Sequence, residues 1–238
     1  MASLGTSFGT AAADYERGRP GYLPDAVAWL LAGVTGVVAD VGAGTGKLTA
    51  EIVAQGFQVT AIDPDEGMLA ALADHLPQVP RAVGTAESLP LADGSCGAVT
   101  LGQAWHWVDV SRASAEIARV LVPGGVLGLI WNVRDESVPW VAALGAAMGA
   151  SAAESLISSD DVDVAAPFGE VEERIWHWQK SMSRNDIRAM VRSRSYYIAG
   201  DEGFKRRVDG DVDTVLGTLA DGPIQMPYAT HAYRALRP

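Results

Sequence analysis

The stretch that decides the fold runs from residue 38 to residue 46 and reads Val-Ala-Asp-Val-Gly-Ala-Gly-Thr-Gly. The β-branched, apolar residues of 36–41 predict a buried strand, because such side chains pack well in sheets. Gly42, Gly44 and Gly46 predict a turn without side chains, and residues 47–54 predict a helix. A strand, a glycine turn and a helix N-terminus together leave backbone N–H groups available to a ligand.

The spacing of these glycines excludes two common nucleotide-binding motifs. A dinucleotide fingerprint needs its third glycine three residues after the second, whereas Gly46 follows Gly44 by two. A P-loop needs glycine and then Ser or Thr at the positions of Val41 and Leu48. The remaining pattern, Asp-x-Gly-x-Gly-x-Gly from Asp40, resembles the first motif of the class I S-adenosylmethionine-dependent methyltransferases. A generic strand-to-helix turn is the alternative.

The second predicted strand, residues 57–62, ends at Asp63. An acid at this strand tip can accept hydrogen bonds from both hydroxyls of a ribose, as it does in dinucleotide-binding folds. The alternative is a cap for the next helix, but Asp65 is better placed for that, before the predicted helix over 66–73. The resemblance also places Met68 against the adenine ring, with core packing as the alternative.

A third short strand is expected to end near Gly84, and the loop after it carries Ala86 and Glu87. In the family that this chain resembles, Gly-x-Ala-Glu at this point borders the adenine. Many members have Asp where this chain has Thr85, so the adenine contact rests on Ala86 and Glu87. A solvated loop charge is the alternative for Glu87. The resemblance places Gln103 near the methionine end of the cofactor.

A fourth predicted strand, residues 97–101, leads into Gly-Gln-Ala-Trp-His-Trp. In doubly wound sheets the ligand lies at the carboxyl ends of the strands, so this segment is expected at the rim of the site. Two tryptophans are costly to expose in a loop, and we expect Trp105 to contact the acceptor. His106 is the candidate general base, and packing between the tryptophans is its alternative.

The segment before the first helix combines Tyr15, Arg19 and Tyr22. It resembles a lead-in of the branch that includes enzymes similar to trans-aconitate methyltransferase. The resemblance implies that Tyr15 and Arg19 lie close to the carboxylate of the cofactor, and it assigns Tyr22 to the acceptor site. Arginine suits a carboxylate because of its two-pronged donor geometry. An unstructured basic N-terminus is the alternative.

The fifth predicted strand, residues 126–131, ends in Trp131-Asn132-Val133-Arg134. The Trp-Asn-x-Arg pattern also occurs in the same branch. An aromatic ring, an amide and a guanidinium at a strand tip predict a wall of the acceptor site. Plain packing of Trp131 is an equal alternative. The four histidines show no metal-ligand spacing, so no metal site is expected.

Strands and helices alternate from residue 37 to about 131, which predicts a doubly wound, mostly parallel α/β sheet. Two later strands are predicted over 171–180 and 224–234. The resemblance makes them an antiparallel edge of a seven-stranded, Rossmann-like methyltransferase fold. Helices predicted over 184–197 and 201–219 then form a small cap.

Two more helices are predicted, one over 22–32 with Pro24 in its first turn and an Ala-rich one over 137–156. Residues 158–163 read as an acidic loop. We expect a single domain over 1–238. Its parts are the lead-in and first helix (1–35), the cofactor-binding core (36–135), and the C-terminal strands with the cap (136–238).

Composition limits the partners of this chain. Its 238 residues, 48% of them hydrophobic, suffice for one α/β domain with a sizeable core. A net charge of −11 argues against nucleic acid, whose phosphates need Lys and Arg. The single cysteine, Cys96, suits a reducing cytosol, and no segment resembles a signal peptide or a membrane helix. We therefore expect a cytoplasmic protein.

These features predict methyl transfer from S-adenosylmethionine to a small molecule by in-line displacement. Orientation and exclusion of water can supply most of the acceleration, so no catalytic dyad is needed. One alternative is a methyltransferase acting on RNA or protein, which a basic patch near the crevice would favour. The other is a non-enzymatic module that binds the cofactor, which a filled crevice would favour.

One feature of the predicted cap bears on the substrate. Arg184, Arg188 and Arg192 are spaced by four and share one helix face. They could attract an anionic substrate, although a solvated helix face is the commoner explanation. The sequence does not predict the oligomeric state.

Overall fold

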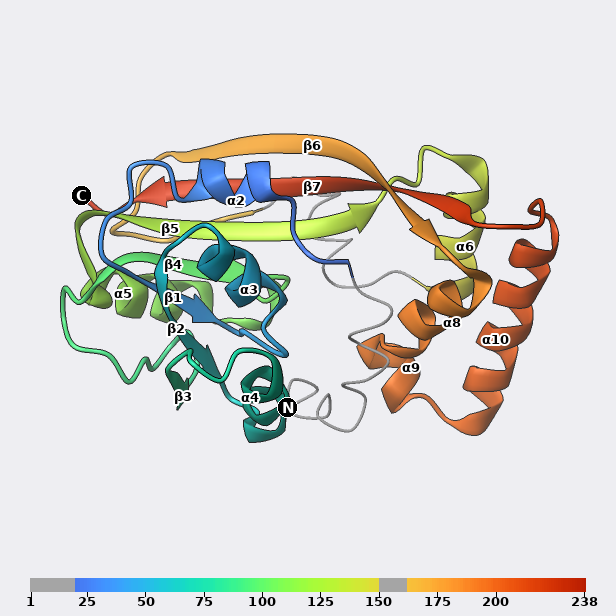
Figure 1. Cartoon of the computed structure of the whole chain (residues 1–238), viewed down its shortest axis with the longest axis horizontal. Helices are drawn as coiled ribbons and strands as arrows, with labels where there is room; N and C mark the ends of the chain where they lie inside the picture. The colour runs from blue at the N-terminus through green and yellow to red at the C-terminus, as the bar shows by residue number, and fades with distance from the viewer. Residues whose placement is uncertain (1–19, 150–161) are drawn as a thin grey trace.

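The computed structural model describes residues 20–149 and 162–238, and these residues form a seven-stranded sheet flanked by helices (Figure 1). The strand order is β3-β2-β1-β4-β5-β7-β6. β1 to β5 pair in parallel, and β7 is antiparallel to both β5 and β6. The predicted parallel sheet with an antiparallel edge is confirmed. The strands are β1 (Val37–Val41), β2 (Gln58–Asp63), β3 (Arg81–Val83), β4 (Cys96–Gly102), β5 (Leu121–Arg134), β6 (Val171–Met182) and β7 (Ile224–Leu236).

Helices cover both faces of the sheet. One apolar cluster joins α2 and α3 to Val38 and Ile130, and a second joins α5 to Leu127 and Trp131. Neighbouring residues of a strand point to opposite faces, so β5 supplies side chains to both clusters. The helical elements are α2 (Pro24–Leu30), α3 (Lys47–Ala54), α4 (Glu66–His75), the 3-10 helix η3 (Trp105–Trp107), α5 (Val110–Val120), α6 (Pro139–Met148), α8 (Arg184–Arg192), α9 (Ser195–Ala199) and α10 (Glu202–Gly217).

A third apolar cluster lies at the far end of the long strands β5, β6 and β7, where α6, α8, α9 and α10 gather (Figure 1). Met226 and Tyr228 of β7 pack in this cluster against residues of α8 and α10. The predicted C-terminal helices therefore form a layer with a core of its own. No helix in the described part of the chain is long and apolar enough to cross a membrane.

Three elements depart most from the predictions. The helix predicted over 184–197 is two helices, because the backbone of Arg194 is extended and the Ser193 hydroxyl donates to Met190 O. β5 begins at Leu121 instead of Val126, because Leu121 pairs with Cys96. The Ala-rich helix spans Pro139–Met148, and 150–156 lie outside the described residues, as does most of the acidic loop.

Candidate cofactor and acceptor site

The glycine turn between β1 and α3 needs glycine for two reasons. The φ angles of Gly42, Gly44 and Gly46 are 69°, 56° and 92°, a region that other residues rarely adopt. At Gly46 a Cβ would lie 2.8 Å from Leu72 Cγ, and at Gly42 it would lie 2.8 Å from Ala104 Cβ. At Gly44 it would have no atom of the described residues within 4 Å. Gly42 and Gly46 thus allow close packing, whereas the described residues leave the space at Gly44 open.

Asp63, at the end of β2, holds this turn in place. Its Oδ2 accepts a hydrogen bond from Gly44 N at 2.8 Å, and its Oδ1 accepts one from Asp65 N at 2.9 Å. The side chain is buried, and burial raises the pKa of its carboxyl above the ordinary value. Asp65 caps α4 by accepting from Gly67 N and Met68 N, as predicted. Each oxygen of Asp63 can still accept a further bond.

Asp40 lies on the other side of the turn and is almost completely buried. Its two carboxylate oxygens accept from Thr49 Oγ1 at 2.6 Å and from Thr100 Oγ1 at 3.1 Å. Burial raises the pKa of Asp40 from 3.8 to about 7, and the two hydroxyls oppose this change. The sequence prediction missed both threonines, although a polar residue inside the apolar run of β4 marks Thr100.

A small cavity of about 10 Å³ lies beside Asp40, roughly the space that one water needs. Tyr22 and Gly102 line it together with Asp40, and Lys47 contributes from the first turn of α3. The structure thereby brings the predicted residues Tyr22, Asp40 and Gly42 to one place. Tyr15 and Arg19 lie outside the described residues.

The predicted adenine side of the site is formed by α4 and the loop after β3. Met68 and Ala86 are both buried, each 4% exposed. Glu87 does not simply project into solvent, because its Oε1 accepts from Asp109 N at 2.8 Å, at the N-terminus of α5. A carboxylate is favourable at a helix N-terminus. Glu87 therefore connects the loop after β3 to α5.

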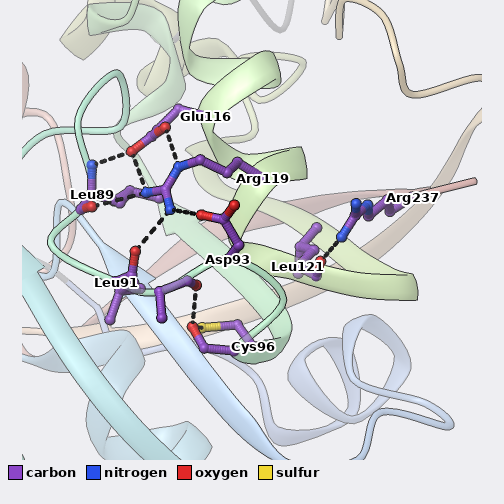
Figure 2. A network of polar contacts seen from close by, with 10 residues as sticks. Leu89, Leu91, Asp93, Cys96, Glu116, Arg119, Leu121 and Arg237 are labelled. Carbon is purple, nitrogen blue, oxygen red and sulfur yellow. Dashed lines mark hydrogen bonds and ion pairs between the residues drawn. The ribbon is translucent and has the colours of Figure 1, made fainter.

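The same loop is anchored from α5 by Arg119 and Glu116 (Figure 2). The guanidinium of Arg119 donates to Leu89 O, Leu91 O and Asp93 Oδ1, and it pairs with Glu116. Glu116 Oε1 in turn accepts from Leu89 N at 2.7 Å. The hydrogen bond from Arg119 lowers the pKa of Glu116. The sequence prediction missed this network, which anchors the loop after β3 to α5.

Gln103 lies where β4 leaves the sheet, with a φ of 57° that is uncommon for a residue other than glycine. Such backbone strain persists where surrounding contacts fix it, and it concentrates at functional sites. Its backbone N–H donates to Ile130 O and its Nε2 donates to Asn132 O, each at 2.9 Å. Gln103 is thus fixed at the rim of the turn, and its role near the methionine end stays a prediction.

Asn132 was predicted to contact the acceptor, but its amide is used within the protein. Its Nδ2 donates to Gly21 O at 3.0 Å, and its Oδ1 accepts from Thr230 Oγ1 at 2.7 Å. The Thr230 hydroxyl also accepts from Trp178 Nε1 at 2.9 Å. Asn132 therefore joins the lead-in to β5 and β7 instead of presenting free donors to a ligand.

The tryptophans predicted to line the acceptor site are core residues. Trp131 is completely buried beside α5 and meets Tyr233 edge-on at 5.7 Å. Trp105 is 2% exposed, and its Nε1 donates to Asp163 O. The burial of Trp131 and Trp105 favours core packing over contact with an acceptor, because neither ring has appreciable exposed surface. His106 is half-buried and tilted against Trp107 at 4.8 Å, and the ring of Trp107 is 49% exposed.

The basic residues predicted near a substrate differ in their surroundings. The side chain of Arg134, at the end of β5, is completely buried and lies 3.5 Å from Glu136. Arg184 donates to the carbonyls of Leu216, Leu219 and Ala220 at the end of α10. Arg188 and Arg192 pair with aspartates of α10. The arginines of α8 thus pair with α10 at the protein surface. This favours the alternative of a solvated helix face over a face that binds an anionic substrate.

An open depression of about 630 Å³ borders the start of α8, far along the chain from the glycine turn. Arg184 and Arg188 line it, but both are bound to α10. Within the described residues, no group of three or more His, Cys, Asp or Glu side chains could hold a metal ion. The glycine turn remains the better candidate site.

Comparison with known proteins identifies the family. Residues 39–129 match the model of a methyltransferase domain. Over 236 residues the chain is 42% identical to an uncharacterised methyltransferase of Mycobacterium tuberculosis, covering 98% of this chain and 96% of that protein. The chain therefore belongs to this methyltransferase family, and the prediction of a methyltransferase is confirmed.

Solved structures share the fold. A putative type II methyltransferase from Anaeromyxobacter dehalogenans aligns with a TM-score of 0.66 at 23% identity, covering 91% of this chain and 97% of that chain. Phosphoethanolamine N-methyltransferase 2 of Haemonchus contortus, in complex with phosphomonomethylethanolamine and S-adenosylhomocysteine, aligns with a TM-score of 0.56 at 16% identity, covering 100% and 61%. The predicted Rossmann-like fold is confirmed, and the trans-aconitate branch stays a prediction.

Proposed function

We propose that this protein transfers a methyl group from S-adenosylmethionine to a small-molecule acceptor. The observation that carries the proposal is the open side of the glycine turn. Among residues 20–149 and 162–238, no atom occupies the space where a side chain of Gly44 would stand, and the Gly44 N–H is fixed by a buried carboxylate, Asp63. Family membership supports the methyl donor, and the neighbour solved with phosphomonomethylethanolamine supports a small acceptor.

The residues around the turn fit the parts of this cofactor. Asp63 keeps acceptor capacity for the two ribose hydroxyls beyond its two N–H donors. Met68 and Ala86, both buried apolar residues, are assigned to the adenine side. Asp40 carries a carboxylate on the other side of the turn, where the cationic methionine end would lie. Further contacts at that end are assigned to Tyr15, Arg19 and Gln103, and Glu87 is assigned to the adenine side.

The protein contributes position more than acid–base chemistry in this proposal. S-adenosylmethionine supplies a methyl group that its positively charged sulfur already activates. Tyr22 and Gln103 orient the two reactants at the rim of the turn, and the lead-in held by Asn132 helps to exclude water. His106 is the candidate to accept a proton where the acceptor loses one.

Calorimetric titration with S-adenosylmethionine and S-adenosylhomocysteine tests the proposal first. Transfer of a labelled methyl group is then measured to a panel of small acids, amines and phenols. Transfer RNA and a protein extract serve as the other arms, and the net charge of −11 predicts that they stay unlabelled. Failure to bind either nucleoside at millimolar concentration would overturn the proposal. Binding without transfer to any arm would favour a non-enzymatic module.

A further inference from the structure

Strand β6 is a long edge strand whose outer side has no partner in the described part of the chain. It is the last strand of the sheet and lies next to β7 alone, along the top of the view in Figure 1. Its 12 residues make it about twice as long as a usual strand. In an edge strand, alternate residues direct their N–H and C=O groups away from the sheet. Among the residues that the structure describes, no backbone hydrogen bond joins β6 to an element other than β7.

β6 lacks several of the features by which proteins protect a sheet edge. Its pairing with β7 runs without interruption from Val171 to Met182, so no bulge turns the edge away. The strand contains no proline, and Ile175 near its middle is 43% exposed. An open edge of this length can pair with a further strand. Charged side chains are the remaining protection, and their pattern decides which strand can pair.

The two ends of β6 carry opposite charges that lack partners. Glu172 near its start is exposed, and Lys180 near its end is half-buried. Within residues 20–149 and 162–238, neither side chain forms a salt bridge or a hydrogen bond. Glu173, by contrast, binds His231 of β7 at 3.0 Å. A strand with an acid at one end and a base at the other attracts an identical strand that runs antiparallel, and it repels one that runs parallel in register.

Symmetry restricts how two copies of β6 can pair. A two-fold axis perpendicular to the sheet keeps each sheet face on its own side, so a residue lies opposite one that is an even number of positions away. With the axis at Trp176, Glu172 lies opposite Lys180 of the second copy, and symmetry repeats this pair. Moving the axis to His177 places Arg174 opposite Lys180, which sets like charges against each other. Moving it one residue the other way takes the partner of Lys180 out of the strand.

The register centred on Trp176 also joins the aromatic surfaces of the two copies. Trp176 meets Trp29 of α2 with ring centroids 5.9 Å apart, and the guanidinium of Arg174 lies over both rings. In the pair, Trp176 lies opposite itself and Arg174 lies opposite Trp178, so the two clusters meet at the axis. On the other face of the sheet, the pairing covers the exposed side chain of Ile175.

We propose that this protein forms a dimer in which the β6 strands of two copies pair antiparallel about Trp176, with Glu172 of each copy bound to Lys180 of the other. One continuous sheet then runs through both subunits. The net charge of −11 repels two copies at a distance, but β6 itself carries two acids and two bases. β4, β5 and β7 separate β6 from β1, which carries the glycine turn. The dimer therefore leaves the candidate site open, and the inference does not depend on the proposed function.

A charge swap in the full chain tests the dimer directly. Glu172→Lys and Lys180→Glu each set like charges against each other, whereas the double variant restores opposite charges in reversed order. Asp211→Lys reverses an exposed acid of α10 and is the control for the change in net charge. Sedimentation equilibrium over a range of protein concentrations gives the dissociation constant of the dimer. Far-UV circular dichroism verifies that each variant folds.

We expect the wild type to dimerise and each single variant to dimerise at least about tenfold more weakly. The double variant and Asp211→Lys should stay within about threefold of the wild type. Hydrogen exchange checks the wild type without any substitution, because amides of β6 should exchange more slowly at high than at low protein concentration.

Three results would overturn the inference. They are a wild type that stays monomeric at about 100 µM, single variants that dimerise as tightly as the wild type, and a double variant that stays as weak as the single ones. A monomer whose β6 pairs with a strand of another protein would overturn it as well. Binding of S-adenosylhomocysteine plays no part in these outcomes, so the proposed function is judged separately.

Discussion

The glycine turn and the outer face of α8 both carry charged side chains, but they hold them differently. At the turn, Asp40 and Asp63 are 1% and 6% exposed. Within the described residues, only hydroxyls and backbone N–H groups donate to their carboxylates. On α8, Arg188 and Arg192 remain in contact with solvent and pair with aspartates of α10.

This difference distinguishes a candidate ligand-binding site, the glycine turn, from the structural ion pairs of α8. A buried carboxylate without a cation is costly, and it shifts its pKa upward, as both aspartates of the turn do. Such groups concentrate at functional sites. An exposed ion pair costs little and contributes little to stability. Changes at the turn should therefore have large effects, and changes on α8 small ones.

The largest effect is expected from the pH dependence that Asp40 imposes. Between pH 4 and 7 the folded protein keeps a proton on Asp40 that the unfolded chain has lost, so the free energy of unfolding falls as pH rises. A pKa raised from 3.8 to about 7 corresponds to about 4 kcal/mol once the pH exceeds 7. Asp40→Asn should remove this loss.

Urea unfolding of the wild type and of Asp40→Asn, at pH 4.5 and at pH 8, measures this loss of stability with rising pH. Taking the difference between the two proteins cancels the titration of other groups, such as Glu116, whose pKa is lowered. The same pair sharpens the functional comparison. If ionised Asp40 attracts the cationic end of S-adenosylmethionine, affinity should rise about tenfold from pH 6 to 8 in the wild type only. If the free energy of unfolding changes equally in both proteins between pH 4.5 and pH 8, Asp40 does not impose the pH dependence.

Asp63→Ala should weaken binding of S-adenosylmethionine by about 1–3 kcal/mol, because hydrogen bonds to a charged group are lost. The substitution also releases Gly44 N from its acceptor. Titration calorimetry gives the value, with Asp74→Ala, an exposed carboxylate on α4, as the control. Unchanged affinity of Asp63→Ala would remove the assignment of the ribose to this residue.

Asn132→Ala should lower the free energy of unfolding by about 1–2 kcal/mol, since Gly21 O and the Thr230 hydroxyl lose a buried partner. Asn185→Ala, on the exposed start of α8, should change it by less. Urea unfolding compares the two variants. Equal effects would mean that the lead-in is not held by Asn132.

The smallest effect is expected from Arg188→Gln, which removes the ion pair with Asp213. Exposed pairs of this kind contribute below about 1 kcal/mol. The variant should also retain the methyl-transfer rate, because the Arg188 guanidinium is already paired with α10. A large loss of activity at unchanged stability would revive the sequence hypothesis of an anion-binding arginine face.

Local patterns predicted the parallel half of the sheet closely. The helix over 47–54 and the Asp65 cap are found where the residues place them, because strand, glycine turn and cap are written in neighbouring positions. The role of Trp131 could not be decided in this way. It differs from Asn132 by one position, and that step turns the side chain to the opposite face of β5, against α5.

Long-range partners were also beyond local patterns. Asn132 binds Gly21 and Thr230, which are 111 and 98 residues away in the chain. The anchoring of the loop after β3 by Arg119 likewise depends on how α5 packs beside that loop (Figure 2). The amide of Asn132 resembles a substrate contact in the sequence, and only the fold shows that it is already bound.

One measurement tests most directly whether the open space at Gly44 receives the cofactor. Gly44 and Gly94 have φ angles of 56° and 58°, and a Cβ added to either meets no atom within 4 Å in the part of the chain that the structure describes. Alanine therefore strains both backbones alike. Calorimetry with S-adenosylhomocysteine should show a loss of at least about tenfold for Gly44→Ala and unchanged affinity for Gly94→Ala. Wild-type affinity in both variants would contradict a cofactor site at the glycine turn.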